Sequence, residues 1–542
     1  MSLREEEATK QSRTIYNFKR HAIQNCLYGV DIDPGAVEIA KLRLWLSLIV
    51  DEEDIKQIKP LPNLDYKIVC GNSLLGVERN LENWKLFAKL EELKPLFFNE
   101  TNANKKQEYK MQIDGIISKI TNGHKDFDFE VYFSEVFHEK NGFDVVIANP
   151  PYVDSEIMTK MDCELRNIYT ASYRSAIGNW DLFIIFIEKG ILLLKKNGII
   201  TYIVPNKLIA ARYSEELRKI LLTKNIKEFR NFAKVNVFKE VNVYPIVFII
   251  QNNSERDFVI MSTMQSVIDI EEENKILAKF FYQDIYWDRY FVSKNMLKII
   301  LKVSKFSSLN YYCKKITGAA TVSEAYKLKK YIREGNNKNT NDFKKLVNTG
   351  TIDPYASLWG KKKIQYIKNK YLNPIIFDKD LQFVSYRRYE QAKSTKIIMA
   401  GMVKKLECLY DEGQYLAGKS TTIILKDRQN KIDLKFLLAL LNSNLISFWY
   451  SRFFTSLALS GGYIRISNKE IGRIPIPEAN TSQSKLFIKT VDRILAITKD
   501  DDYLVNFEKQ AQVRNYERQI DQMVYKLYGL TNDEIKIVEK NK

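Results

Sequence analysis

The sequence is poor in the residues that build metal sites and disulfide frameworks. Its 542 residues contain only three histidines, which argues against a histidine-based zinc site or proton relay. The five cysteines occur singly, without a Cys-x-x-Cys pair, at Cys26, Cys70, Cys163, Cys313 and Cys408. Cysteines in this pattern are typical of a reducing compartment. We therefore expect no metal site and a cytoplasmic location.

Long apolar runs and an apolar leader are also missing. No stretch of about 18 apolar residues is free of charge, and a membrane-spanning helix needs about that length. The first seven residues, MSLREEE, are acidic and contain no apolar signal region. We thus expect neither a membrane-spanning helix nor secretion.

The chain carries an excess of positive charge. Lysine and arginine number 84 against 66 aspartates and glutamates, which gives a net charge of +18. This balance suits a polyanionic partner, either nucleic acid or an anionic membrane face. The length and the 45% hydrophobic content are sufficient for two or more packed cores.

The pattern of apolar residues divides the chain into three regions. Strand-like runs alternate with helical stretches over residues 1–285, which predicts an α/β fold with a mostly parallel sheet. Residues 82–140 predict a helical insertion in this domain. Residues 286–480 carry short β-rich runs, which predict an α+β domain, and residues 481–542 return to helical periodicity.

Residues 142–152, GFDVVIANPPY, are the most informative stretch for chemistry. A buried strand ends abruptly at two prolines, and in open α/β sheets ligands bind at the carboxyl ends of strands. The Asn149 amide oxygen and the Pro150 carbonyl can both accept from one exocyclic NH2, while Tyr152 can stack on the base that carries it. The alternative interpretation is a strand followed by a proline-rich turn, in which asparagine is an ordinary turn residue.

Two further strand-like runs end in polar residues. Residues 28–34 end in Asp31 and Asp33, and an acid at the tip of a strand can accept from ribose hydroxyls. Asp33 has an alternative role as the N-cap of the following helix. Residues 66–75 end in a turn where Asn72 either contacts an adenine ring or is a simple turn residue.

Basic and aromatic residues gather in the second half of the chain. Cationic side chains neutralise phosphates and aromatic rings supply contact area, so this region predicts a DNA-facing surface. A solvated charged face is the alternative, because a count of charges does not show which side chains share a face. The predicted DNA-binding residues are Lys361, Lys362, Lys363, Arg387 and Arg388.

Residues 413–420, GQYLAGKS, match the phosphate-binding P-loop pattern. That loop presents its amides to phosphate only when a strand precedes it and a helix follows. The next residues, 421–425, are β-branched and strand-like, so we exclude nucleotide hydrolysis.

Asn149-Pro150-Pro151-Tyr152 resembles the catalytic motif of the S-adenosylmethionine-dependent amino-methyltransferases. Together with residues 28–34, 70–75 and 198–206, it resembles the gamma-class N6-adenine DNA methyltransferases. The closest subgroup resemblance is to the methyltransferase and target-recognition part of type IIG restriction-modification enzymes. This resemblance implies a Rossmann-like methyltransferase domain over residues 1–285. It also implies a target-recognition domain over residues 286–480, where 441–446, 460–462 and 474–477 resemble pieces of such domains.

The resemblance also assigns roles to single residues. It implies that S-adenosylmethionine is bound by Asp31, Ile32, Asn72 and Ser73. The catalytic residues that it implies are Asn149, Pro150, Pro151 and Tyr152. Phe238 would be a second aromatic against a base flipped out of double-stranded DNA, with an ordinary core phenylalanine as the alternative.

The chain departs from the family pattern at its beginning. The family's glycine-rich cofactor loop and the strand before it should precede Asp31, but residues 1–26 contain no glycine. Without that strand, the strands that end at Asp31 and Asn149 lack a shared neighbour and leave backbone groups unpaired. We therefore expect a fragment or one part of a split enzyme, with an upstream polypeptide that supplies the loop and a nuclease domain.

The leading hypothesis is a restriction-modification enzyme that methylates adenine N6 in double-stranded DNA at a specific sequence. One alternative is a DNA-recognition fragment that is inactive alone because the glycine-rich loop is missing. The others are a protein-glutamine or an N4-cytosine methyltransferase. The basic second half of the chain disfavours a protein substrate.

Overall fold

The computed structural model describes most of the chain and divides it into two compact units. The described residues are 15–50, 64–77, 84–100, 102–121, 123, 127–238, 244–282, 286–313, 315–335, 342–426, 432–454, 463–466 and 468–541. The first unit comprises residues 1–260 and 277–285, and the second comprises residues 261–276 and 286–542. The segment 460–462, expected in the target-recognition domain, lies outside the described residues.

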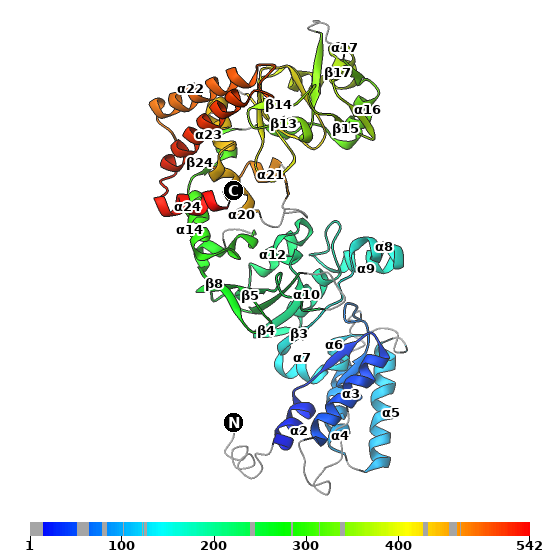
Figure 1. Ribbon diagram of the computed structural model, residues 1–542. Helices are drawn as coiled ribbons and strands as arrows, with labels where there is room; N and C mark the ends of the chain where they lie inside the picture. Colours follow the sequence, from blue (N-terminus) through cyan, green and yellow to red (C-terminus); the bar gives the residue numbers. More distant parts are fainter. Residues whose placement is uncertain are drawn as a thin grey trace. The chain divides into compact units, whose positions relative to one another are not determined.

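The first unit begins with a small parallel sheet between helices (Figure 1). Strand β1 pairs with β2 in parallel, with Gly29 opposite Ile68 and Asp31 opposite Cys70. The predicted cap of the next helix is confirmed, because the Asp33 carboxylate accepts the Gly35 N–H at 2.8 Å. These elements are α2 (Ile15–Asn25), β1 (Gly29–Asp31), α3 (Pro34–Ile49) and β2 (Ile68–Cys70).

Helices occupy the described part of residues 82–140, where the insertion is expected. Helices α4 (Trp84–Asn99) and α5 (Ala103–Ile120) pack side by side (Figure 1). Their shared core includes Leu93 and Ile117, and the short helices α6 (Phe129–Tyr132) and α7 (Ser134–Lys140) follow. The insertion therefore forms its own small core beside the strands.

A six-stranded sheet follows in the order β3-β4-β6-β5-β7-β8. Strand β3 is parallel to β4, whereas β6 is antiparallel to both β4 and β5. The expectation of a mostly parallel sheet is thus met by the β1–β2 and β3–β4 pairs but not by the two pairs that β6 forms. The strands are β3 (Phe143–Ala148), β4 (Leu194–Pro205), β5 (Asn225–Asn231), β6 (Pro245–Gln251), β7 (Phe258–Met264) and β8 (Ile270–Leu277).

The pair Asn197-Gly198 does not end a helix, as its sequence suggests, but lies inside β4. Helix α10 (Phe183–Leu192) ends earlier, and Asn197 has a left-handed φ of 66°. The pairing of β3 with β4 shifts register at this point. A Cβ atom on Gly198 would lie only 2.7 Å from the Phe143 carbonyl oxygen, so the irregularity requires glycine there.

The second unit contains two four-stranded sheets of short strands and a set of helices. One sheet has the order β10-β22-β18-β20 and the other the order β11-β17-β12-β21. The strands of the first are β10 (Ile316–Gly318), β22 (Thr422–Leu425), β18 (Lys396–Met399) and β20 (Cys408–Asp411). Those of the second are β11 (Arg333–Glu334), β17 (Pro374–Phe377), β12 (Phe343–Val347) and β21 (Tyr415–Ala417). The P-loop-like segment 413–420 contains β21 and leads into β22, so a strand rather than a helix follows its lysine and serine.

Helices α22 (Thr481–Thr498), α23 (Phe507–Leu527) and α24 (Asn532–Lys540) end the chain. Two local signals mark the ends of these helices. Gly529 has a left-handed φ of 68° after α23, and Thr531 forms a capping box with Glu534 at the start of α24. Among the described helices, none combines the length and apolarity that crossing a membrane requires.

Candidate active site at the strand ends

A cavity of about 880 Å³ lies in the first unit, at the carboxyl ends of β1, β2 and β3. It brings together residues that are far apart in the sequence but follow strands of the same unit. The predicted site residues that line it are Asp31, Ile32, Asn72, Ser73, Asn149, Pro150 and Pro151. Its size falls within the range of about 300–1,000 Å³ that is usual for small-ligand sites.

The Asn-Pro-Pro corner leaves the sheet directly after β3. Asn149 is exposed, Pro150 is buried, and both line the cavity. Within the described part of the chain, the Asn149 side chain has no hydrogen-bond partner. Its amide oxygen is therefore available to a ligand, on a backbone that the two prolines stiffen.

The Tyr152 ring is anchored beside this corner rather than in the cavity lining. Its hydroxyl donates to the Ile203 carbonyl oxygen on β4 at 3.2 Å, and burial raises the pKa of the hydroxyl to about 12. Phe238 lies next to it, with ring centroids 6.1 Å apart and an interplanar angle of 78°. The structure thus places the two predicted aromatics together, edge to face.

Asp31 and Ile32 form the tip of β1. One Asp31 carboxylate oxygen accepts the Asp33 N–H at 2.9 Å, which orients the carboxylate at the strand end. The Ile32 side chain is 70% exposed although it is apolar. An exposed acid beside an exposed apolar side chain can receive a ligand that has both hydroxyls and a flat apolar face.

The Asn72 side chain is largely engaged within the protein. Its amide nitrogen donates to the Tyr169 hydroxyl at 2.8 Å, and its amide oxygen accepts the Leu74 N–H at 3.0 Å. One amide hydrogen remains for a ligand. Through its hydrogen bond to Tyr169, Asn72 also links helix α9 (Cys163–Ser172) to the end of β2.

Sequence reasoning missed the contribution of α9 to the cavity. Arg166 lines it and donates to the Ser155 hydroxyl and the Gly178 carbonyl, both at 3.0 Å. Its guanidinium lies 5.2 Å from the centroid of the Trp180 ring. No local pattern indicates these contacts, because they join α9 to segments on either side of it in the chain.

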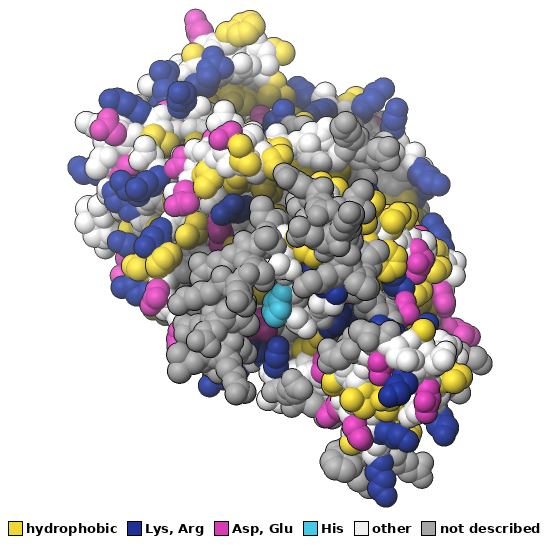
Figure 2. Space-filling view, turned by 90° about the horizontal axis from the view of Figure 1, so that it is seen from below, with side chains coloured by type: hydrophobic (Ala, Val, Ile, Leu, Met, Phe, Trp, Pro, Cys, Tyr) yellow, Lys and Arg dark blue, Asp and Glu magenta, His cyan; other side chains and the backbone are white. Residues whose placement is uncertain are grey.

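The predicted DNA-binding residues fall into two groups in the second unit. Lys361, Lys362, Lys363 and Arg387 are exposed. Lys361 donates to the Asp501 carbonyl oxygen at 3.2 Å. Figure 2 shows the molecule from below the view of Figure 1, and on that face Lys and Arg side chains are spread among Asp and Glu.

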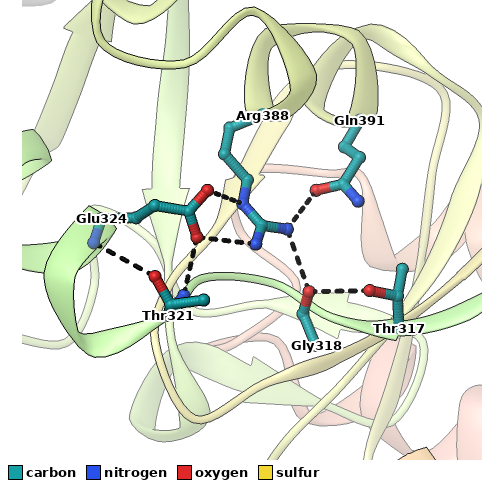
Figure 3. A network of polar contacts seen from close by, with 6 residues as sticks. All are labelled: Thr317, Gly318, Thr321, Glu324, Arg388 and Gln391. Carbon is teal, nitrogen blue, oxygen red and sulfur yellow. Dashed lines mark hydrogen bonds and ion pairs between the residues drawn. The ribbon is translucent and has the colours of Figure 1, made fainter.

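Arg388 belongs to the interior, with only 4% of its surface exposed. Its Nε and Nη2 atoms donate to the two carboxylate oxygens of Glu324 at 3.1 and 2.8 Å (Figure 3). Its Nη1 atom donates to the Gly318 carbonyl and the Gln391 side chain (Figure 3). A guanidinium with all these donors engaged is not a phosphate contact, so the expectation for Arg388 is corrected to a structural role.

Comparison with known proteins identifies the two regions. Residues 25–238 match the family described as Eco57I restriction-modification methylase, and residues 328–476 match the TaqI-like C-terminal specificity domain. The first match contains all the strand-end residues of the cavity, and the second contains the exposed basic residues.

The chain is similar to type II restriction and modification enzymes. It is 26% identical over 272 residues to the type II restriction enzyme and methyltransferase RM.Eco57I of Escherichia coli, which covers 49% of this chain and 23% of that protein. It is 31% identical over 197 residues to the type II methyltransferase M.HincII of Haemophilus influenzae, covering 33% of this chain and 36% of that protein. A solved structure of the type IIL restriction-modification enzyme MmeI in complex with DNA matches 98% of this chain and 75% of that chain, at 11% identity and a TM-score of 0.47.

These matches show that the chain is similar to restriction-modification methyltransferases. More particularly, the chain carries an Eco57I-type methylase region followed by a TaqI-like specificity domain. It spans about a quarter of the length of the first curated relatives, 23% of one and 27% of another.

Proposed function

We propose that this chain is the methyltransferase and target-recognition part of a type IIG restriction-modification system. It transfers a methyl group from S-adenosylmethionine to adenine N6 at a specific sequence in double-stranded DNA. The observation that carries the proposal is the position of Asn149 and Pro150 in the same cavity as Asp31 and Ile32. One cavity thus offers two carbonyl acceptors for an amino group and, beside them, an acid and an apolar side chain for a nucleoside.

The chemistry depends on positioning the amino group. An amino group conjugated to a purine ring is a poor nucleophile, because its lone pair is delocalised. The Asn149 amide oxygen and the Pro150 carbonyl would accept hydrogen bonds from its two N–H groups and turn the lone pair out of the ring plane. S-adenosylmethionine supplies an electrophilic methyl group on a sulfonium. The prolines keep the two acceptors in fixed positions, so orientation contributes most of the acceleration.

The aromatic pair Tyr152 and Phe238 supports the choice of a base as substrate. A base can reach Asn149 only after it leaves the duplex, which costs a few kcal/mol of unstacking. Tyr152 would stack on the extruded base and offset part of this cost. Because its hydroxyl is held by the Ile203 carbonyl oxygen, the ring is already oriented before the base arrives.

The residues of β1 fit the nucleoside part of the cofactor. Asp31 would accept from the ribose hydroxyls, and Ile32 would pack on the adenine ring. We expect Asp31→Ala to weaken binding of S-adenosylmethionine by about 10- to 100-fold, because a charged acceptor is removed. Isothermal titration calorimetry with the unmodified chain as reference measures this effect.

Asp33→Ala is the matched control for that variant. Asp33 lies two residues away, is also exposed, and caps α3 through the Gly35 N–H. We expect it to lower the stability of the protein by about 1 kcal/mol and to leave cofactor affinity unchanged. Equal losses of affinity in both variants would show that Asp31 acts only through the fold of β1 and α3.

The exposed basic residues of the second unit are proposed to contact DNA phosphates. We expect the triple variant Lys361→Gln, Lys362→Gln and Lys363→Gln to weaken duplex binding. The slope of log K against log salt should fall by about 2 to 3, or about 0.9 for each phosphate that is no longer neutralised. Fluorescence anisotropy over a range of salt concentrations measures the slope.

The control uses three exposed lysines of the C-terminal helices, changed to glutamine together: Lys526, Lys536 and Lys540. It removes the same net charge from the same unit. If both triple variants change the slope equally, duplex binding depends on net charge and not on this cluster.

The alternative function, DNA recognition without catalysis by this chain alone, makes a different prediction. It expects salt-dependent duplex binding together with no measurable heat on titration with S-adenosylmethionine. Transfer to protein glutamine or to cytosine N4 predicts a different product, which nucleoside and peptide mass spectrometry of the methylated substrate identifies.

A further inference from the structure

A second cavity, of about 550 Å³, lies within the second unit. Its walls come from β20, β21, the loop after α22, and the turn between β13 (Ile352–Asp353) and β14 (Ala356–Ser357). The Thr498 hydroxyl at the end of α22 donates to the Tyr355 carbonyl oxygen in that turn at 3.1 Å, which joins the two walls. The cavity is therefore built by the fold of this unit, and its size is usual for a small-ligand site.

Aromatic rings form much of the wall. The four that line the cavity are Trp359, Tyr410, Tyr415 and Tyr503. The Trp359 indole N–H donates to the Pro374 carbonyl oxygen at 2.9 Å, and the Ser357 hydroxyl donates to that of Tyr415. Rings that the protein already holds can stack on a flat ligand with little further loss of rotational freedom.

Polar groups without partners lie beside these rings. The Lys345 ammonium is 4.8 Å from the centroid of the Trp359 ring and, within the described part of the chain, makes no hydrogen bond or ion pair. Asn373 and Gln414 also line the cavity, and their side-chain amides have no hydrogen-bond partner among the described residues. An amide supplies a donor and an acceptor together, and the ammonium can turn from the ring to an acceptor on a ligand. Such groups suit the hydrogen-bonding edge of a heteroaromatic ring.

The charges around the cavity balance. Its lining includes three lysines and three exposed acids, namely Lys345, Lys361, Lys499, Glu412, Asp500 and Asp501. A further acid, Asp411, is buried and paired with Lys396. A ligand with several charges of one sign, such as a polyphosphate or a polyamine, would meet as many repelling as attracting groups. The lining therefore favours a flat, uncharged ligand with polar edges.

We propose that this cavity binds a single unpaired nucleobase. The base stacks on the aromatic rings, with the Asn373 and Gln414 amides and the Lys345 ammonium at its polar edge. It belongs either to a free nucleoside or to a DNA strand from which it has been extruded, since both present the same ring. Lys361, which lines the cavity, is among the lysines proposed to contact DNA phosphates, and this favours DNA as the source. Only that choice of source rests on the proposed function.

The test uses deoxyguanosine as the probe, because it lacks the adenine ring that the strand-end cavity is proposed to bind. We expect the full chain to bind one deoxyguanosine with a dissociation constant below about 1 mM. The chain has six tryptophans, which 5-fluorotryptophan labelling makes visible by ¹⁹F NMR. The resonance of Trp359, assigned with Trp359→Phe, should shift on titration. A shift confined to the other tryptophans would overturn the proposed position.

Two lysine variants on β12 test the polar edge. Lys345→Met should weaken deoxyguanosine binding about tenfold or more, because it removes an ammonium that donates to the base. The matched control is Lys344→Met, since the Lys344 ammonium lies outside the cavity lining, 3.7 Å from Asp378, and its loss should change affinity by no more than about twofold. Equal affinities of the two variants would overturn the proposal. Asp31→Ala should bind the probe normally, so failure of the cofactor site and failure of this cavity are distinguishable.

Two duplexes of the same sequence identify the source of the base. One is fully paired, and the other carries a single bulged deoxyguanosine. If the cavity takes a base from DNA, the chain should bind the bulged duplex about tenfold more tightly, and Lys345→Met should remove this preference. Binding of deoxyguanosine without such a preference assigns the cavity to free nucleosides. Absence of both, with deoxyguanosine tested up to about 5 mM, would overturn the proposal.

Discussion

Asn149→Ala should abolish methyl transfer while it leaves duplex affinity within about twofold. Removing one preorganised polar group that acts on the reacting atoms typically costs about 10²- to 10³-fold in turnover. Here the missing oxygen is one of only two proposed acceptors for the amino group. The measurement is incorporation of labelled methyl groups into duplex DNA, with binding followed separately by fluorescence anisotropy.

Two comparisons test whether the loss of activity is due to the missing Asn149 amide oxygen. Asn149→Asp keeps an oxygen acceptor at the same position and should retain more activity than the alanine variant. The folded state should be unaffected by either change, because Asn149 is exposed and its side chain has no partner in the described part of the chain. Turnover of Asn149→Ala at the rate of the unmodified chain would remove Asn149 from the mechanism.

Arg388→Met should cause the largest loss of stability among single changes in the second unit that we consider. It leaves the Glu324 carboxylate, which is 24% exposed, without its bidentate partner (Figure 3). Breaking a buried ion pair on one side costs about 3–5 kcal/mol, and partial exposure of Glu324 places this case near the lower value. Urea unfolding followed by circular dichroism measures the change in the free energy of unfolding.

The neighbouring exposed arginine provides a matched control. Arg387→Met removes the same charge from the same helix and should change the free energy of unfolding by no more than about 0.5 kcal/mol. The double variant Arg388→Met with Glu324→Met removes both charges and should recover part of the loss. Equal stability of the Arg387 and Arg388 variants would contradict the structural role of Arg388.

The same ion pair predicts a dependence of stability on pH. Hydrogen bonds from Arg388 lower the pKa of Glu324 from its ordinary value of 4.5 to about 2. Because the folded-state pKa is the lower one, the contribution is complete above about pH 4.5 and is lost as the pH falls towards 2. The Arg388→Met variant should lose less stability than the unmodified chain over this range.

The sequence predicted the residues at strand ends well. The apolar run before Asn149 and the acid-tipped run before Pro34 each mark a strand and its end, because local composition determines where a strand stops. Since parallel strands end at the same edge, Asp31, Asn72 and Asn149 could be placed around one site before any coordinates. The helix caps at Asp33 and Thr531 could also be predicted, because a helix cap depends only on a few neighbouring residues.

Contacts between residues that are far apart in the sequence could not be predicted in the same way. Arg388 is followed and preceded by residues much like those around Arg387, and only the packing of its helix against Glu324 decides which of the two is buried. The hydrogen bond from Asn72 to Tyr169 joins residues 97 positions apart, so no local pattern predicts it. The antiparallel β6 was missed because an apolar run has no direction of its own.

The position of β6 between β4 and β5 sets the order in which the first unit can assemble during translation. Strands β4 and β5 leave the ribosome before β6, yet they are not neighbours in the sheet. Strand β4 can pair with β3 at once, but its other edge and the facing edge of β5 stay open until residues 245–251 are made. The nascent chain therefore carries two exposed hydrophobic edges until β6 emerges. Synthesis that stalls or terminates before that point should release an aggregation-prone polypeptide rather than a smaller folded domain.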